Sequence, residues 1–236
     1  MKEGPEYVYS QEELYKQGVD LVINRKYKSA SNHFFKMYTD NPANKFASRA
    51  MLLEAYSLYR NKDYLDAIHT LKDLETFHPK GCPLDYVYYL KMLCYASQIQ
   101  EVEGCSGVAN TALKLGYVVM TLFPQSPYAE KFLSFHIPKI QNYLNEKEMY
   151  IGRLHLKECN PVGAILSFQN VINSNKDEYF LPEALFRMTE SYLMLGLPGE
   201  ASKCQKILKD KFAENFWTQA ADKRMQNLAL KPKKTN

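Results

Sequence analysis

A motif of helical periodicity that recurs after 37 residues constrains the fold of this chain more than any other feature. Its two clearest copies read Tyr27, Ala30, Phe34, Met37, Pro42 and Tyr64, Ala67, Leu71, Leu74, Pro79. Offsets of three, four and seven residues place side chains on one face of an α-helix. The segments before the two copies also match, since Gly18 corresponds to Ala55. Each copy therefore predicts a pair of helices, with the motif on the second.

The spacing has a physical reason at the place where the two helices of a pair cross. A small residue there lets the helices approach closely, and large apolar residues fill the space around it. Pro42 and Pro79 follow the second helices, which they cannot continue. Short turns, such as residues 24–26, favour an antiparallel arrangement. We therefore predict an all-α, tetratricopeptide-like right-handed superhelix.

Weaker copies of the motif follow along the chain. They contain Ala112, Val119 and Pro124 in the third, Gly152, Pro161, Ala164, Phe168 and Val171 in the fourth, and Leu185, Tyr192, Pro198, Ala201 and Leu208 in the fifth. In the third copy, Gly116 stands where we expect a large apolar residue. We expect an extra helix over 128–144 that Pro138 kinks or divides, and a capping helix over 216–228. The predicted array is about five helix pairs plus that C-terminal cap.

Charge and motif content argue against several classes of function. The net charge is +4, and the only basic cluster is the tail of Lys231, Lys233 and Lys234, so we expect no binding of nucleic acid. The five histidines form no H-E-x-x-H, and the five cysteines form no C-x-x-C. Phosphate-loop, dinucleotide and nucleophile-elbow motifs are also absent from the sequence. We predict a non-enzymatic protein without metal or cofactor.

The repeat register places a mixed aromatic and basic stripe on the first helices of the first three pairs. These candidate binding residues are Tyr15, Val19, Arg49, Leu52, Tyr56, Tyr59, Arg60, Tyr86 and Tyr89. Aromatic rings accept aromatic side chains, and arginine binds a carboxylate through two hydrogen bonds. The stripe therefore predicts a groove for an extended peptide with aromatic side chains and a carboxylate. In the alternative interpretation, some of these tyrosines pack between neighbouring pairs and meet no ligand.

No stretch of 18 apolar residues occurs, so the sequence predicts no membrane-spanning helix. Residues 1–10 are polar and lack the apolar segment of a secretion signal. The first cysteine is Cys82, so no residue near the start of this sequence could carry a lipid. We expect any lipid anchor to be absent from this chain.

Several segments, in order, resemble one family. Residues 7–15 (YVYSQEELY) form a tyrosine-containing entry to the first helix, and His78-Pro79 is followed by D-Y-V-Y-Y at 85–89. Residues 123–129 (FPQSPYA), 148–152 (EMYIG) and 182–196 continue the resemblance. Together these segments are similar to the BamD family of the bacterial β-barrel assembly machine, and the last two are similar to its alphaproteobacterial branch. The resemblance covers nearly the whole chain.

The resemblance implies a lipoprotein on the periplasmic face of the outer membrane. It implies binding to the periplasmic domains of BamA and to accessory lipoproteins of the machine. It also implies recognition of unfolded outer-membrane β-barrel proteins by their aromatic-ended C-terminal signals. On this basis we expect an N-terminal extension (1–9), repeats one to three with the substrate-signal groove (10–125), repeats four and five with linking and capping helices for docking of BamA and the accessory lipoproteins (126–230), and a basic tail (231–236).

The missing anchor leaves two interpretations open. Either the anchor belongs to a part of the protein that is not in this sequence, or this copy is not attached to the membrane. Five free cysteines are also unusual for an oxidising compartment. The alternative function is a cytosolic tetratricopeptide adaptor for a chaperone or a secretion system.

Overall fold

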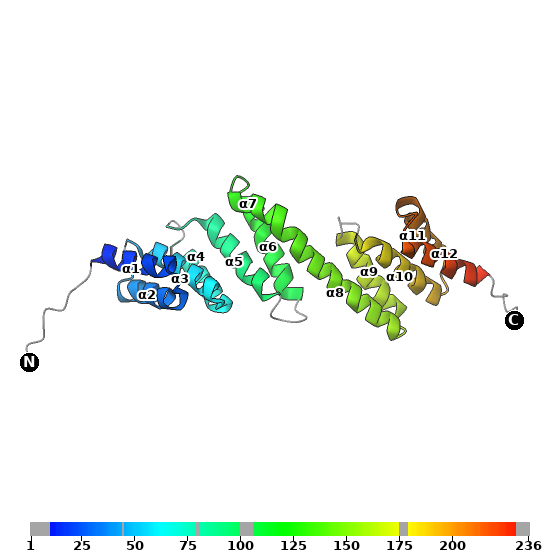
Figure 1. The fold of residues 1–236 in the computed structure, drawn as a ribbon, viewed down its shortest axis with the longest axis horizontal. Coiled ribbons are helices and arrows are strands. Elements are labelled where there is room, and N and C mark those ends of the chain that lie inside the picture. Colours follow the sequence, from blue (N-terminus) through cyan, green and yellow to red (C-terminus); the bar gives the residue numbers. More distant parts are fainter. Residues whose placement is uncertain (1–9, 44, 79–80, 100–105, 175–178, 230–236) are drawn as a thin grey trace, which may run out of the picture. The chain divides into compact units, whose positions relative to one another are not determined.

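The computed structural model describes residues 10–43, 45–78, 81–99, 106–174 and 179–229, and these form helices joined by turns without a strand (Figure 1). The contacts between residues divide the chain into two compact units, Met1–Ile140 and Gln141–Asn236. The helices fall into the predicted pairs, which confirms an all-α fold of tetratricopeptide type. The predicted extension (1–9), tail (231–236) and irregular loop (101–105) lie outside the described residues.

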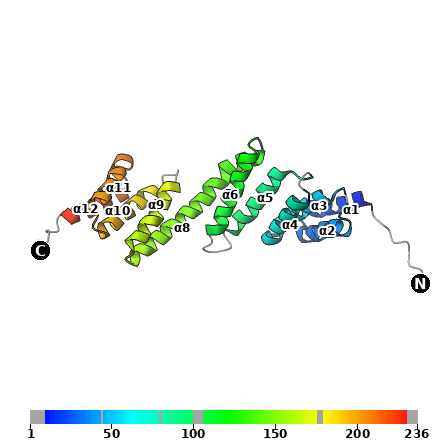
Figure 2. The same cartoon turned by 180° about the vertical axis from the view of Figure 1, so that it is seen from behind.

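The first unit contains three helix pairs in chain order (Figure 1). They are α1 (Gln11–Ile23) with α2 (Tyr27–Asp40), α3 (Ala47–Asn61) with α4 (Tyr64–Phe77), and α5 (Leu84–Gln98) with α6 (Ser106–Leu122). Each pair also packs on the next, α2 against α3 and α4 against α5. Figure 2 shows the same succession from behind.

Local sequence chemistry sets where these helices begin and end. Ser10 forms a capping box, in which its hydroxyl accepts from the Glu13 amide at 3.2 Å and the Glu13 carboxylate accepts from the Ser10 amide at 2.7 Å. At the other end of a helix, Lys62 adopts a left-handed conformation with φ of 71°. Such a residue stops the α-helical hydrogen bonds and turns the chain into α4.

The helices of a pair cross where an aromatic ring covers a glycine. A Cβ atom on Gly18 would lie 2.5 Å from the ring of Phe34, and one on Gly152 would lie 2.5 Å from the ring of Phe168. In each case the ring lies 16 residues further along the chain and is fully buried. Because the rings have no room to move, these positions require glycine. The predicted role of small residues at the crossings is therefore confirmed.

Gly116 follows the same rule, and the interpretation of this position from the sequence was wrong. It does not replace a large apolar residue of the third second-helix. The ring of Phe132 covers it, and an added Cβ would lie 2.0 Å from that ring. Phe132 is again 16 residues further along and fully buried. Thus α6 crosses the segment that follows it in the same manner as the first helix of a pair.

The segment after α6 differs from the separate linking helix expected over 128–144. It comprises α7 (Pro127–Lys131), a π-helical turn η1 (Phe132–His136) and α8 (Ile137–Lys157), which follow one another without a break. The helix is not divided at Pro138, which lacks an N–H to donate. Instead, the Ile137 amide donates to the Phe132 carbonyl, five residues back. This wider turn lies just before Pro138 and leads directly into the first helix of the fourth pair.

The second unit contains the end of α8 and four further helices. They are α9 (Pro161–Ser174), α10 (Leu181–Met194), α11 (Pro198–Lys211) and α12 (Phe216–Ala229). Three of these helices carry a proline in their first turn, where its missing N–H has no partner to lose. The core comprises Met149, Phe168, Leu185, Leu208 and their neighbours. The expected capping helix is α12, which packs on α10 and α11.

Among the described residues, no helix combines the length and the apolar character needed to cross a membrane.

Candidate functional site

The predicted groove residues lie on three first helices that are neighbours in the structure. Tyr15 and Val19 belong to α1, Tyr86 and Tyr89 to α5, and the remaining five to α3. Helix α3 touches both α1 and α5, so the stripe forms one surface of the first unit. Within it, the environments of the side chains differ strongly.

Tyr15 and Val19 are half-buried against the core of the first pair. The ring of Tyr15 is stacked on Phe46, with the centroids 5.1 Å apart, and is tilted against Phe34 at 6.1 Å. Stacking of this kind stabilises the junction between α2 and α3. These two residues therefore contribute to packing and present only one edge to a ligand.

Arg60 is exposed and held over two tyrosine rings. Its guanidinium carbon lies 4.8 Å from the centroid of Tyr27 and 5.7 Å from that of Tyr56. Its Nη1 donates to the Tyr56 hydroxyl at 2.7 Å. A guanidinium has five N–H donors, so several remain for a bidentate partner. Tyr27, which the sequence interpretation placed only in the helix pairing, is thus part of this surface.

Arg49 and Leu52 complete the contribution of α3. Arg49 is exposed, and Leu52 is half-buried against the cluster around Met51. Arg49 and Arg60 are 11 residues apart, which places both on the same face of the helix at a rise of about 16 Å. The face therefore presents a charge near each end and apolar side chains between them.

The tyrosines of α5 form a buried aromatic cluster with the linking segment. Tyr128 is 4.8 Å from Tyr89 and 5.2 Å from Tyr86 between ring centroids. The Tyr89 hydroxyl and His136 Nε2 share a hydrogen bond of 3.0 Å. Burial raises the pKa of Tyr59, Tyr86 and Tyr89 and lowers that of His136. Tyr89 is only 9% exposed, so the packing interpretation describes its environment.

This surface can bind and has little means to catalyse. Its polar groups are phenols and guanidinium groups, and the phenol pKa shifts point away from ionisation. Among the described residues, no group of three His, Cys, Asp or Glu could hold a metal ion. The chemistry on offer is stacking on aromatic rings and hydrogen bonding to an anion.

A second site lies in the second unit, and the sequence analysis did not identify its residues. It is a cavity of about 500 Å³ formed by α8, α10 and α12. The lining residues are Arg153, Leu156, Lys157, Arg187, Glu190, Leu193, Met194, Arg224 and Asn227. Its charged side chains belong to helices that are far apart in the chain, so no local motif indicates them.

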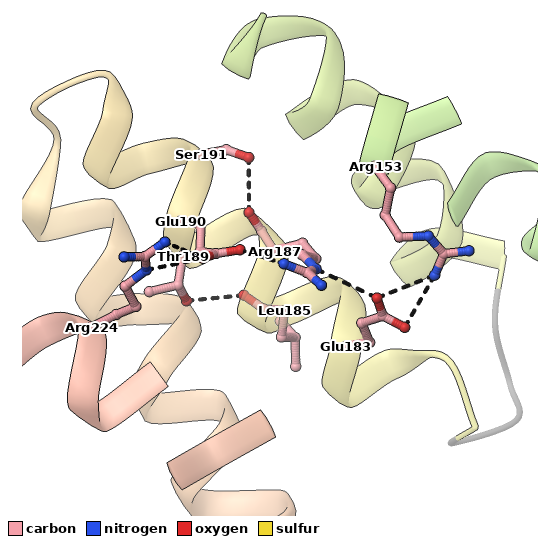
Figure 3. Close-up of polar contacts among 8 residues, drawn as sticks. All are labelled: Arg153, Glu183, Leu185, Arg187, Thr189, Glu190, Ser191 and Arg224. Atoms are coloured by element: carbon pink, nitrogen blue, oxygen red, sulfur yellow. Dashed lines mark hydrogen bonds and ion pairs between the residues drawn. The ribbon is translucent and has the colours of Figure 1, made fainter. Parts of the chain in front are cut away.

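An alternating row of arginine and glutamate, here called the arginine–glutamate ladder, runs along this cavity (Figure 3). Arg153 Nη1 contacts both oxygens of Glu183 at 3.2 Å. Arg187 joins Glu183 at 3.4 Å to Glu190 at 2.8 Å. Arg224 donates to Glu190 through Nε at 3.0 Å and Nη2 at 2.8 Å. The ladder thus connects α8, α10 and α12.

Comparison with known proteins relates the chain to one family. Residues 8–207 match the model of the YfiO family, described as an outer membrane lipoprotein. The outer membrane protein assembly factor BamD of Rickettsia prowazekii is 35% identical over 214 residues, which cover 91% of this chain and 85% of the relative. The BamD of Caulobacter vibrioides is 29% identical over 231 residues, covering 97% and 75%.

Solved structures that resemble the chain are tetratricopeptide repeat proteins. One is TTC0263 of Thermus thermophilus, with a TM-score of 0.41 and 15% identity over 94% of this chain and 100% of that protein. The sequence relatives carry the assignment, because the family match includes nearly all of the described helices. This chain belongs to the YfiO family of outer membrane lipoproteins.

Proposed function

We propose that this chain is a non-enzymatic scaffold for the assembly of outer-membrane β-barrel proteins. Its relatives are named as outer membrane protein assembly factors, which supports the role. A set of stacked helix pairs offers extended surfaces for protein partners and needs no reaction centre. In this proposal the first unit recognises the C-terminal signals of unfolded barrel proteins, and the C-terminal pairs dock BamA and accessory lipoproteins.

The observation that carries the first role is the placement of Arg60 over Tyr27 and Tyr56. A peptide that ends in an aromatic residue presents a ring and a carboxylate close together. The tyrosine face of α3 suits the ring, and the remaining N–H groups of Arg60 suit the carboxylate. Because Arg60 is held by stacking and by the Tyr56 hydroxyl, binding immobilises little additional side chain.

Replacing Arg60 tests this groove. We expect Arg60→Gln to weaken binding of a peptide with a C-terminal Phe by about tenfold, the loss of one charge-assisted contact. Lys72→Gln, an exposed change on α4, is the matched control and should leave the affinity unchanged. Calorimetric titration of the purified chain measures both.

The same peptide with an amidated C-terminus separates charge recognition from aromatic stacking. Wild-type protein should bind the amide about as weakly as Arg60→Gln binds the acid, and that variant should no longer distinguish the two peptides. If Arg60→Gln distinguishes acid from amide as well as wild type does, Arg60 is not the carboxylate partner.

The docking role is tested with the soluble periplasmic part of BamA. We expect a saturable complex by calorimetry at micromolar protein concentrations. Absence of binding, together with a cytosolic location of the native protein in cell fractionation, would instead favour an adaptor for a chaperone or secretion system. Recovery of the native protein with the outer membrane would agree with lipid anchoring at the periplasmic face.

A further inference from the structure

The cavity of the second unit carries a positive charge that its own carboxylates do not neutralise. Four cationic side chains line it, from Arg153, Lys157, Arg187 and Arg224. Two carboxylates oppose them, Glu190 in the lining and Glu183 beside it. Four positive charges against two negative charges leave an excess of two. Lys157 is exposed and has no ion-pair partner among the residues that the structure describes.

The two kinds of charge differ in depth. The side chains of Glu183 and Glu190 are 18% and 12% exposed, whereas those of Arg153 and Arg224 are 38% and 59% exposed. The carboxylates therefore lie behind the guanidinium groups and orient them (Figure 3). Arg153 uses one nitrogen for Glu183, so donors of its planar group remain for an anion in the cavity.

The middle of the ladder is rigid. The Arg187 guanidinium carbon lies 5.2 Å from the Phe186 ring centroid and 5.3 Å from that of Trp217. Two glutamates fix its direction within the plane of these contacts. An arginine held in this way loses little conformational freedom when an anion approaches, which favours binding.

The rest of the cavity is apolar. Leu156, Leu193 and Met194 line it, and Met194 is 49% exposed. An exposed methionine adapts its shape to an incoming side chain at little cost. Apolar walls beside an anchored set of arginines are typical of a site that accepts a carboxylate and a neighbouring hydrophobic group.

We propose that this cavity docks an acidic segment of a partner protein, in which a carboxylate is followed by an apolar side chain. The carboxylate contacts Arg153, Lys157 or Arg224, and the apolar side chain fits against Leu156, Leu193 and Met194. The proposal rests on the scaffold function only in that the C-terminal pairs dock a partner. It assigns the chemistry of one contact, which a peptide tests without BamA.

The same geometry argues against a nucleic-acid phosphate as the occupant. Glu183 and Glu190 lie directly behind the arginines and would repel a second negative charge along a phosphate backbone. The apolar walls would also have no counterpart on a phosphate. A single carboxylate beside a hydrocarbon group satisfies both parts of the lining.

The experiment measures fluorescence polarisation of a short labelled peptide containing Glu-Glu-Leu-Leu, with the full chain. The control peptide contains Gln-Gln-Leu-Leu. We expect the acidic peptide to bind at least tenfold more tightly, and Arg224→Gln and Lys157→Gln each to weaken it by about tenfold. Lys223→Gln removes a charge from the same helix as Arg224 but outside the lining, and should leave binding within about twofold.

Several results would overturn the proposal. They are an absence of saturable binding by wild type up to about 1 mM, equal binding of both peptides, or equal losses in the Lys223 and Arg224 variants. Competition by inorganic phosphate alone would indicate a small-anion site instead. Self-association of wild type that Lys157→Gln abolishes in sedimentation velocity would assign the cavity to a second copy. Unchanged melting temperatures of the variants, with the expected binding losses, would support the docking site.

Discussion

At the scale of single residues, Glu54 carries an ionisable group in an environment that opposes its charge. It lies in α3 and is 6% exposed. The Thr70 hydroxyl is 3.5 Å from its Oε1, and its Oε2 has no hydrogen-bond partner among the described residues. Burial raises the pKa of Glu54 to about 7; nearby Asp66 and Asp73 raise it further, and the hydroxyls of Tyr38 and Thr70 offset part of this rise.

This environment predicts that the first unit loses stability as the pH rises. The folded-state pKa of Glu54 lies above its ordinary value of 4.5. The folded chain therefore binds the proton more tightly, and the free energy of unfolding falls between about pH 4.5 and 7. Glu54→Gln keeps the shape without the charge and should raise the free energy of unfolding at pH 8 by roughly 2–3 kcal/mol.

The measurement is urea unfolding, followed by circular dichroism, at pH 5 and pH 8. The stabilising effect of Glu54→Gln should be small at pH 5, where the wild-type carboxyl is already protonated in the folded chain. Glu130→Gln, an exposed change in the same unit, should have no effect at either pH. Equal stability of wild type and Glu54→Gln at pH 8 would contradict a buried, strained carboxyl.

At the scale of elements, the pairs depend on a glycine that faces a ring 16 residues further along. This relation recurs at Gly18, Gly116 and Gly152. It joins two antiparallel helices in two cases and joins α6 to the π-helical turn in the third. The rule follows from local spacing, so it holds even where the following segment is not an ordinary second helix.

Two helical glycines provide a matched test of this rule. Gly152→Ala would place a Cβ 2.5 Å from the buried ring of Phe168, and overpacking of this kind costs about 1–3 kcal/mol. Gly199, in the first turn of α11, has no atom within 4 Å of an added Cβ. Gly199→Ala should be neutral or stabilising by about 0.5 kcal/mol. Thermal unfolding followed by circular dichroism compares the two variants, and equal melting temperatures would contradict the crossing rule.

At the scale of the whole molecule, the two units have separate cores and only one of them contains a tryptophan. Trp217 is the single tryptophan of the sequence and packs against Phe186 in the second unit. Tryptophan fluorescence therefore reports unfolding of the second unit, while circular dichroism reports both. Chains with separate cores need not unfold in one step.

This organisation predicts that each variant shifts one transition. Gly152→Ala should lower the urea midpoint measured by fluorescence, whereas Glu54→Gln at pH 8 should raise only the midpoint measured by circular dichroism. The comparison uses the same samples for both signals. A fluorescence midpoint that moves with Glu54→Gln would indicate one cooperative unit instead.

The sequence predicted the helix pairs well because the signals that specify them are local. The spacing of small and large residues over one or two turns identified the crossing at Gly18, and proline identified the helix ends. Gly116 was misinterpreted because local spacing does not state which later segment covers a glycine. Tyr128 and the ladder were missed for a related reason: Glu183 and Glu190 meet Arg153 and Arg224 from 30 and 34 residues away. The domain boundary expected after residue 125 and the binding roles of the stripe stay predictions.

The stacking of Arg187 on Trp217 has a practical consequence. A cation held 5.3 Å from the ring centroid belongs both to the ladder and to the surroundings of the indole. A carboxylate that enters the cavity and draws on this guanidinium would alter the field at the indole. Emission from the unlabelled protein should therefore change in wavelength or intensity as the cavity fills, which gives the second unit a built-in optical sensor of its own occupancy.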